Sequence, residues 1–242
     1  MVFLVPAHGP NNVTEGERDP GALGSGTDEA AVSAELTADV AQFLDAFTDV
    51  ALVPSGTLDA RVTWLMAHMR ADDWAFSLHM NSGGGTGTEV VYDDQKPGLR
   101  NEATQLAQFI AAGLGLANRG AKPDSATPRK YLGLVSRPPG RVFIVETAFQ
   151  DNPSDVRAVQ TNGPRVVAEA IRSVMGIDAP SEQAKPSPVF IPTKEQQEGY
   201  DFCRNAGIYT DQTPRNALVT TETLSVYLKR AADKGLLNLP AA

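Results

Sequence analysis

Two of the three histidines in this 242-residue chain stand at the ends of apolar runs. His8 follows Val-Phe-Leu-Val-Pro-Ala, and His79 follows Trp-Ala-Phe-Ser-Leu. Because the strands of open α/β sheets build their sites at their carboxyl ends, two such strands suggest a pair of metal ligands. A catalytic zinc takes three protein ligands from nitrogen and oxygen donors and keeps a fourth position for water. The pattern therefore predicts a metal site that also needs a carboxylate ligand and a base.

The third ligand is predicted to be Glu29, in the first turn of an expected helix that follows the loop leaving His8. The helix dipole favours the ionised carboxylate at this position. Asp19, Asp28 and Glu35 lie in the same region and compete with Glu29 for the role. Spacing alone does not choose among the four.

The base is predicted to be Glu146, which ends the run Arg-Val-Phe-Ile-Val-Glu. A carboxylate at the end of a buried strand costs several kcal/mol unless it is paired or used. Partial burial would raise the pKa of this carboxyl toward the range that suits a general base. A structural salt bridge is the alternative interpretation.

Two other features are interpreted as non-catalytic. His68 lies in the middle of an expected helix, which indicates a structural imidazole. The Gly-rich run 83–87 lacks the Lys-Ser/Thr of a phosphate-binding loop, so its glycines are expected to let substrate pass close to the backbone.

The elements that must position these residues alternate between strand and helix. Apolar runs predict strands over 2–6, 49–53, 74–80, 88–92, 131–135 and 141–146. Helical periodicity predicts helices over about 28–47, 57–69, 101–116 and 164–175. This alternation predicts an α/β fold: a three-layer domain with a central, mostly parallel or mixed sheet flanked by helices.

Composition bounds the partners. The net charge of −8 and the pI near 4.9 argue against nucleic acid as a partner. No apolar run approaches the roughly 20 residues that span a bilayer, so no membrane insertion is expected. The single cysteine, Cys203, excludes an internal disulfide framework. The N-terminus lacks the charged region of a signal peptide, which favours a protein made in the cytoplasm.

A change in composition divides the chain. Residues 1–177 are expected to form the catalytic domain, and residues 178–190, rich in proline and polar residues, an extended linker. Residues 191–242 carry two helical patterns and are too short to bury much core alone. We expect a small helical module there.

The motifs, taken in order, resemble a known family over about residues 1–176. They are A-H-G at 7–9, D-P-G-A-x-G at 19–24, E at 29, S-L-H-M-N-S at 77–82, T-E-V-V-Y at 88–92, N-R-G at 118–120 and V-E-T-A-F-Q-D-N at 145–152. This set resembles the zinc-dependent N-acetylmuramoyl-L-alanine amidases of the Amidase_3 type, found in bacterial cell-separation enzymes and phage endolysins. The resemblance implies zinc held by His8, Glu29 and His79, with Glu146 as the catalytic glutamate. The family usually has a second glycine after its first histidine, and this chain has Pro10 at that position.

The implied activity is hydrolysis, in peptidoglycan, of the amide between N-acetylmuramic acid and L-alanine. Zinc would activate a water and Glu146 would act as general base. Two alternatives stay open: another zinc peptidoglycan hydrolase, a carboxypeptidase or endopeptidase, and a non-catalytic cell-wall-binding protein.

Residues 205–231 resemble the S-layer-homology-like modules that some wall enzymes carry. The resemblance implies a module that binds the wall or forms a homodimer. The resemblance to the amidase family, together with the lack of a signal peptide, favours a phage endolysin that stays in the host cytoplasm until lysis and then acts on the cell wall; a host autolysin with an unusual export route is the alternative.

Overall fold

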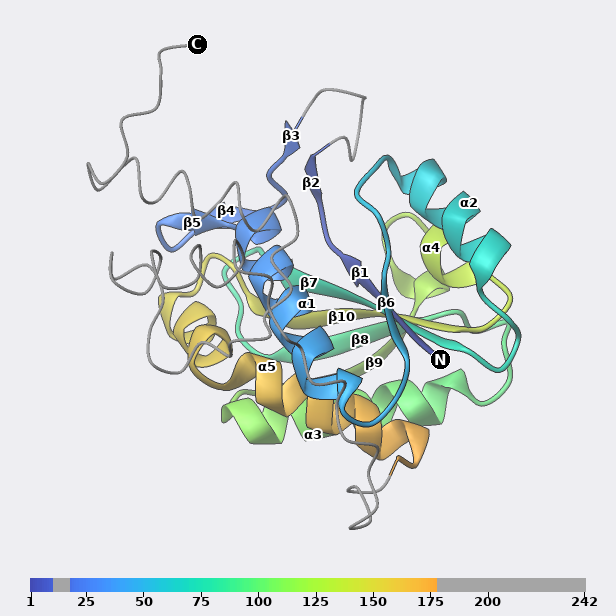
Figure 1. Cartoon of the computed structure of the whole chain (residues 1–242). Coiled ribbons are helices and arrows are strands. Elements are labelled where there is room, and N and C mark those ends of the chain that lie inside the picture. Colours follow the sequence, from blue (N-terminus) through green and yellow to red (C-terminus); the bar gives the residue numbers. More distant parts are fainter. Residues whose placement is uncertain (11–17, 178–242) are drawn as a thin grey trace, which may run out of the picture. The chain divides into compact units, whose positions relative to one another are not determined.

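The computed structural model describes residues 1–10 and 18–177. Their centre is a six-stranded sheet with strand order β6-β1-β7-β10-β8-β9 (Figure 1). Its strands are β1 (Val2–Pro6), β6 (Val50–Leu52), β7 (Trp74–Asn81), β8 (Thr88–Tyr92), β9 (Asn118–Pro123) and β10 (Arg141–Phe149). Two short hairpins pair β2 (Gly9–Pro10) with β3 (Arg18–Asp19), and β4 (Leu23–Gly24) with β5 (Thr27–Asp28).

The sheet is mixed, and the change of direction falls at β8. Strands β6, β1, β7 and β10 run parallel to one another. Strand β8 is antiparallel to β10, and β9 is parallel to β8. The carboxyl ends of β1, β7 and β10 therefore meet at one edge, and β8 begins at that same edge. Side chains from four strands can converge there.

Helices cover both faces of the sheet. They are α1 (Glu29–Asp45), α2 (Leu58–His68), α3 (Leu99–Leu114), α4 (Gly133–Ser136) and α5 (Pro153–Met175), with a 3₁₀ turn, η1, at Asp124–Ala126. One core cluster joins α1, α3 and α5 to one face, and a second joins α2 and α4 to the other. The central strands are mostly apolar, as expected for strands buried on both faces, and their polar residues include Ser77, His79 and Glu146. The predicted three-layer α/β fold is confirmed.

The prediction of a strand over 131–135 is wrong. This segment is a loop followed by the short helix α4, from which Leu134 and Val135 enter the second core cluster. Among the six strands of the central sheet, the sequence did not predict β9. This edge strand consists of exposed and half-buried residues that give no clear alternation. The error at 131–135 arises because a short apolar run fits a helical turn or a strand equally well.

Helix α5 begins at Pro153, well before the predicted start at 164. Asn152 caps it, accepting hydrogen bonds from the amides of Ser154 and Asp155. The Asn-Gly-Pro sequence at 162–164 resembles a break, and a proline inside a helix costs about 3 kcal/mol. Buried valines before and after Pro164 pack into the same core, and this burial outweighs the cost.

Several predictions fall on other parts of the chain. The linker 178–190, the module 191–242, Cys203 and the S-layer-homology-like segment 205–231 lie outside the described residues. Within the described ranges, every helix is too short or too polar to cross a membrane.

One buried hydroxyl joins the three elements that lead to the predicted ligands. Ser33, on α1, donates to the Leu78 carbonyl at 2.5 Å and accepts from the Ala7 amide at 2.7 Å. Ala7 precedes His8, Leu78 precedes His79, and Ser33 lies one turn after Glu29. Ser33 thus fixes the ends of β1 and β7 against the start of α1.

We expect Ser33→Ala to lower the free energy of unfolding by about 2 kcal/mol, because it leaves a buried N–H and a buried C=O without partners. Thr37 is the matched control, since its hydroxyl is equally buried on α1 and has no hydrogen-bond partner among the described residues. Thr37→Val should therefore be neutral or stabilising. Urea unfolding of both variants measures the difference, and equal losses would contradict the role given to Ser33.

Candidate active site

Strand alternation brings the polar side chains of the sheet into one row. In the sheet register Glu146 of β10 lies beside His79 of β7 on one side and beside Glu89 of β8 on the other. Residues paired in register project from the same face. All three side chains therefore project from the face that α2 and α4 cover, at the edge where β1 also ends.

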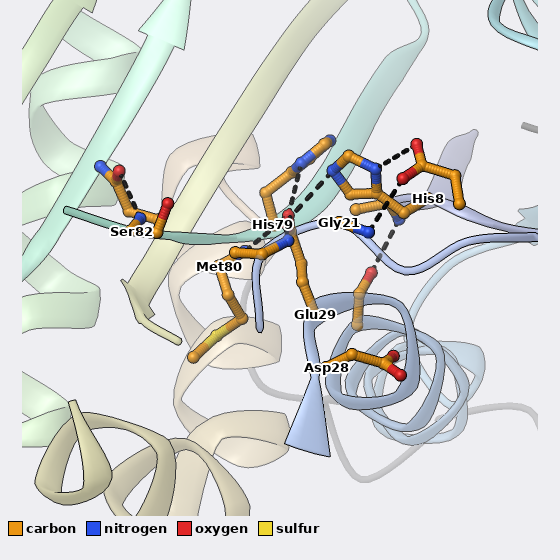
Figure 2. A network of polar contacts seen from close by, with 12 residues as sticks. His8, Gly21, Asp28, Glu29, His79, Met80 and Ser82 are labelled. Carbon is orange, nitrogen blue, oxygen red and sulfur yellow. Dashed lines mark hydrogen bonds and ion pairs between the residues drawn. The ribbon is translucent and has the colours of Figure 1, made fainter. Parts of the chain in front are cut away.

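Glu29 links the two predicted imidazole ligands. Its Oε1 lies 2.9 Å from His79 Nδ1, and its Oε2 lies 3.2 Å from His8 Nε2 (Figure 2). The amide of Met80 donates to Oε1 at 3.1 Å, and the amide of Ala22 donates to Oε2 at 2.9 Å. Both carboxylate oxygens are thus fixed in a side chain that is 5% exposed.

His8 is held in an unusual backbone conformation. Its φ is +53°, a region that non-glycine residues adopt rarely. Arg61, buried on α2, donates to the carbonyls of Pro6 at 2.6 Å and His8 at 2.7 Å. The buried guanidinium therefore stabilises the turn that points the imidazole toward Glu29.

Each imidazole has a further partner on its outer nitrogen. His8 Nδ1 donates to Asp19 Oδ2 at 2.7 Å, and His79 Nε2 lies 3.1 Å from the Ser77 hydroxyl. A hydroxyl can donate or accept, so Ser77 can accommodate either tautomer of His79. These contacts leave His8 Nε2 and His79 Nδ1 facing Glu29, and such outer partners are typical of metal-binding histidines.

Protonation follows from this arrangement. Burial alone would lower the pKa of His8, but hydrogen bonds and attraction from Glu29 and Asp19 raise it to about 9. Burial would raise the pKa of Glu29, but the two imidazoles and the Ala22 amide hold it well below its usual range. Without a metal, an ionised Glu29 carboxylate therefore faces a protonated His8 at neutral pH.

The same donors fit a metal ion. One ligand atom from each of His8, Glu29 and His79 lies within 4.8 Å of the others. Ligand atoms around one ion with bonds of about 2 Å lie roughly 3–4 Å apart. A Cβ at Gly21 would lie 2.5 Å from Glu29 Oε2 and 2.7 Å from His8 Cδ2, so only glycine leaves this space open. Two imidazoles and a carboxylate are donors that zinc prefers.

Glu146 lies beside this group without joining it. Its Oε2 is buried and has no hydrogen-bond partner among the described residues. Burial raises the pKa of Glu146 to about 7; Glu29 and Glu89 add to the rise, and His79 and His8 oppose it. A carboxyl with a pKa near neutrality can both take and return a proton.

Comparison with known proteins decides the family. The family model described as N-acetylmuramoyl-L-alanine amidase (Amidase_3) matches residues 2–176. The chain belongs to this family. A sporulation-specific N-acetylmuramoyl-L-alanine amidase of Bacillus subtilis is 27% identical over 174 residues, which cover 66% of this chain and 60% of that protein. The amidase LytC of the same organism is 30% identical over 164 residues, covering 64% of this chain and 30% of LytC.

Solved structures show the same amidase fold. The catalytic domain of CwlV, from Bacillus (Paenibacillus) polymyxa var. colistinus, gives a TM-score of 0.60 at 19% identity, covering 73% of this chain and 98% of that domain. The catalytic domain of an endolysin targeting Clostridia difficile gives 0.59 at 18% identity, covering 74% and 98%. The chain spans about 60% and 30% of the lengths of the two curated relatives above.

The competitors of Glu29 have other contacts in this amidase fold. Asp28 caps α1 by accepting from the Ala31 amide and pairs with Arg18, while Asp19 contacts His8 only on its outer nitrogen. Glu35 is exposed on α1. Glu29 is the member of this set that contacts both imidazoles.

The two features interpreted as non-catalytic lie away from the ligand cluster. His68 stacks on Trp64 with ring centroids 4.1 Å apart, and its ring Nδ1 contacts the Trp64 carbonyl. Packing requires a glycine at position 85, because a Cβ there would lie 2.5 Å from the Phe149 ring. The Asp151 carboxylate accepts from the amides of Gly83 and Gly84.

A groove of about 650 Å³ runs past the site. Its lining includes His8, His79 and Glu146, together with residues that sequence reasoning missed: Ser77, Glu89, Arg61 and Lys122. Ser77 and Glu89 could have been found from alternation, because each shares the face of a predicted site residue. Arg61 gives no such signal, since it lies on a helix far away in sequence.

We expect the chelator-treated amidase to lose stability as the pH rises from 7.5 to 9.5. The pKa of His8 is raised by folding, so its contribution is complete below about pH 6.5 and is lost as the pH passes about 9. The loss over this window is about 2 kcal/mol. Urea midpoints at the two pH values measure it. His8→Gln should flatten the dependence, and the matched control His68→Gln should retain it; an unchanged slope in His8→Gln would contradict the assignment.

Proposed function

We propose that the chain is a zinc-dependent peptidoglycan amidase that cleaves the amide between N-acetylmuramic acid and L-alanine. Membership in the amidase family supports the reaction. The observation that carries the proposal is the cluster of His8, Glu29 and His79, whose two histidines line the same groove as Glu146, a carboxyl with one buried oxygen that lacks a hydrogen-bond partner among the described residues.

His8, through Nε2, His79, through Nδ1, and Glu29 would hold the ion. When bound, zinc supplies a Lewis acid that polarises the scissile carbonyl and lowers the pKa of the attacking water. Asp19 holds the His8 ring by accepting from Nδ1. A neutral His79 with a free Nδ1 carries its single ring proton on Nε2, and the Ser77 hydroxyl accepts a hydrogen bond from that Nε2–H.

Glu146 is the base in this proposal. It takes a proton from the water as the new C–O bond forms to the lactyl carbonyl carbon. As the C–N bond breaks, the same carboxyl returns the proton to the alanine nitrogen. The products are the carboxylate of the muramic lactyl group and a peptide with a free N-terminal L-alanine.

The phage-endolysin setting, action on the wall after host lysis, and wall binding or dimerisation by residues 191–242 stay predictions from sequence. Sedimentation of the full chain with cell walls, compared with a chain ending at residue 177, measures wall binding. Sedimentation equilibrium of the full chain measures dimerisation. A chain that neither sediments with walls nor dimerises would contradict the prediction for this module.

A digest of purified peptidoglycan tests the reaction. The full chain should expose new N-terminal L-alanine, lose this activity in chelator and regain it with zinc. New reducing ends would indicate a glycosidase, and free amino acids would indicate a carboxypeptidase. Either product in place of N-terminal alanine would overturn the proposal.

Glu146→Gln should retain the bound metal and lower kcat by about 10²–10⁴-fold, because it removes the proton acceptor and leaves the three ligands in place. Glu89→Gln is the matched control: the same substitution one strand away, in the same groove. It should stay within about tenfold of the parent. Metal content and muropeptide turnover measure both variants, and a larger loss in Glu89→Gln would exchange the two roles.

A further inference from the structure

The groove crosses the sheet in strand order and its two ends differ in charge. His8 follows β1, and His79, Glu146, Glu89 and Lys122 lie on β7, β10, β8 and β9, which are successive neighbours in the sheet (Figure 1). The ligand cluster therefore lies at the β1–β7 end. Lys122, on β9, lines the groove at its other end.

Lys122 projects into the groove because of its register. It pairs with Val91, which pairs in turn with Ile144, and both of these neighbours line the groove. Residues paired across a sheet share a face. The Lys122 side chain therefore lies on the same face as Glu146, and it is 40% exposed.

The charge of Lys122 is only weakly matched by protein groups. Glu89 lies nearest, but its Oε2 accepts from Arg119 Nε at 3.0 Å and its Oε1 accepts from the Asn81 amide at 3.2 Å. Lys122 Nζ lies 3.8 Å from Oε1, beyond hydrogen-bond distance. Arg119 neutralises Glu89 more closely, and a positive charge is left at this end of the groove in a chain with net charge −8.

We propose that Lys122 binds a free carboxylate of the leaving peptide. The inference rests on the proposed amidase reaction. Of the two sides of the scissile amide, the peptide carries free carboxylates, whereas the muramic acyl group is uncharged. The peptide therefore lies toward β9 and the sugar toward β1.

The dimensions agree with this orientation. Strands lie about 4.8 Å apart and residues about 3.3 Å along a strand, so the Lys122 backbone, two strands and two residues away in register, is about 12 Å from that of Glu146. Two extended residues span at most about 7 Å. A carboxylate on the second residue of the peptide thus falls between Glu146 and the Lys122 backbone, where a lysine side chain reaches it. The specificity that follows is for peptides whose second residue has a free α-carboxylate over those in which it is a carboxamide.

Two synthetic muropeptides test this specificity. Both carry muramoyl-L-alanine followed by a γ-linked D-glutamyl residue, with a free α-carboxylate in one and a carboxamide in the other. The metal-loaded full chain should cleave the carboxylate form with a kcat/KM about tenfold higher, as a charge-assisted contact requires. Lys122→Gln should remove this preference by lowering kcat/KM for the carboxylate form alone.

Lys130→Gln is the matched control, because Lys130 is exposed and does not line the groove. It makes the same change in net charge and should keep the preference. Equal cleavage of both substrates by the parent chain, or an equal loss on both in Lys122→Gln, would overturn the subsite and leave the amidase function intact. A parent chain that cleaves neither substrate would overturn the proposed function, and the subsite with it.

Discussion

The site depends on one buried negative charge. A carboxylate as enclosed as that of Glu29 would ordinarily be neutral, since removing it from water is costly. It stays ionised because two imidazoles face it and two backbone amides donate to it. This requirement sets the surroundings: α1 must begin at Glu29, the loop must return the Ala22 amide, and β7 must present the Met80 amide. Gly21 must lack a side chain that would fill the same space.

The reversal of strand direction at β8 shapes the rest of the groove. An all-parallel sheet would bring only carboxyl ends to this edge. Here β8 begins at the edge, so Glu89 lies beside Glu146 in an antiparallel pair. Strand β9, parallel to β8, then carries Lys122 on the same face. The groove thus has carboxylates at its centre and a cation at the sheet edge, where the side chain can reach solvent.

The sequence predicted the strands that carry the site, because long apolar runs and strand-end polar residues leave few alternatives. It predicted the layers for the same reason, and it placed Glu146 at the end of a strand, where β10 has it. Sequence spacing could not single out Glu29 among the four carboxylates, because the choice depends on the loop geometry that points the Ala22 amide at it. Strand β9 and helix α4 were missed because short, half-buried segments have weak periodicity. The support from Arg61 and Ser33 was missed because it arises only when α2 and α1 pack on the sheet.

Burial acts on both Glu29 and Glu146, and their different polar partners set their pKa values apart. Glu29 has four polar neighbours and its pKa is held low, which suits a ligand that must stay ionised. For Glu146, at the end of β10, burial raises the pKa; one oxygen lacks a hydrogen-bond partner among the described residues, and Glu29 and Glu89 add to the rise. A carboxyl held in this way can exchange a proton near neutral pH. The start of α1 and the end of β10 therefore bring together one carboxyl that stays ionised and one that can exchange a proton, which are the two properties that the proposed metal ligand and the proposed base need.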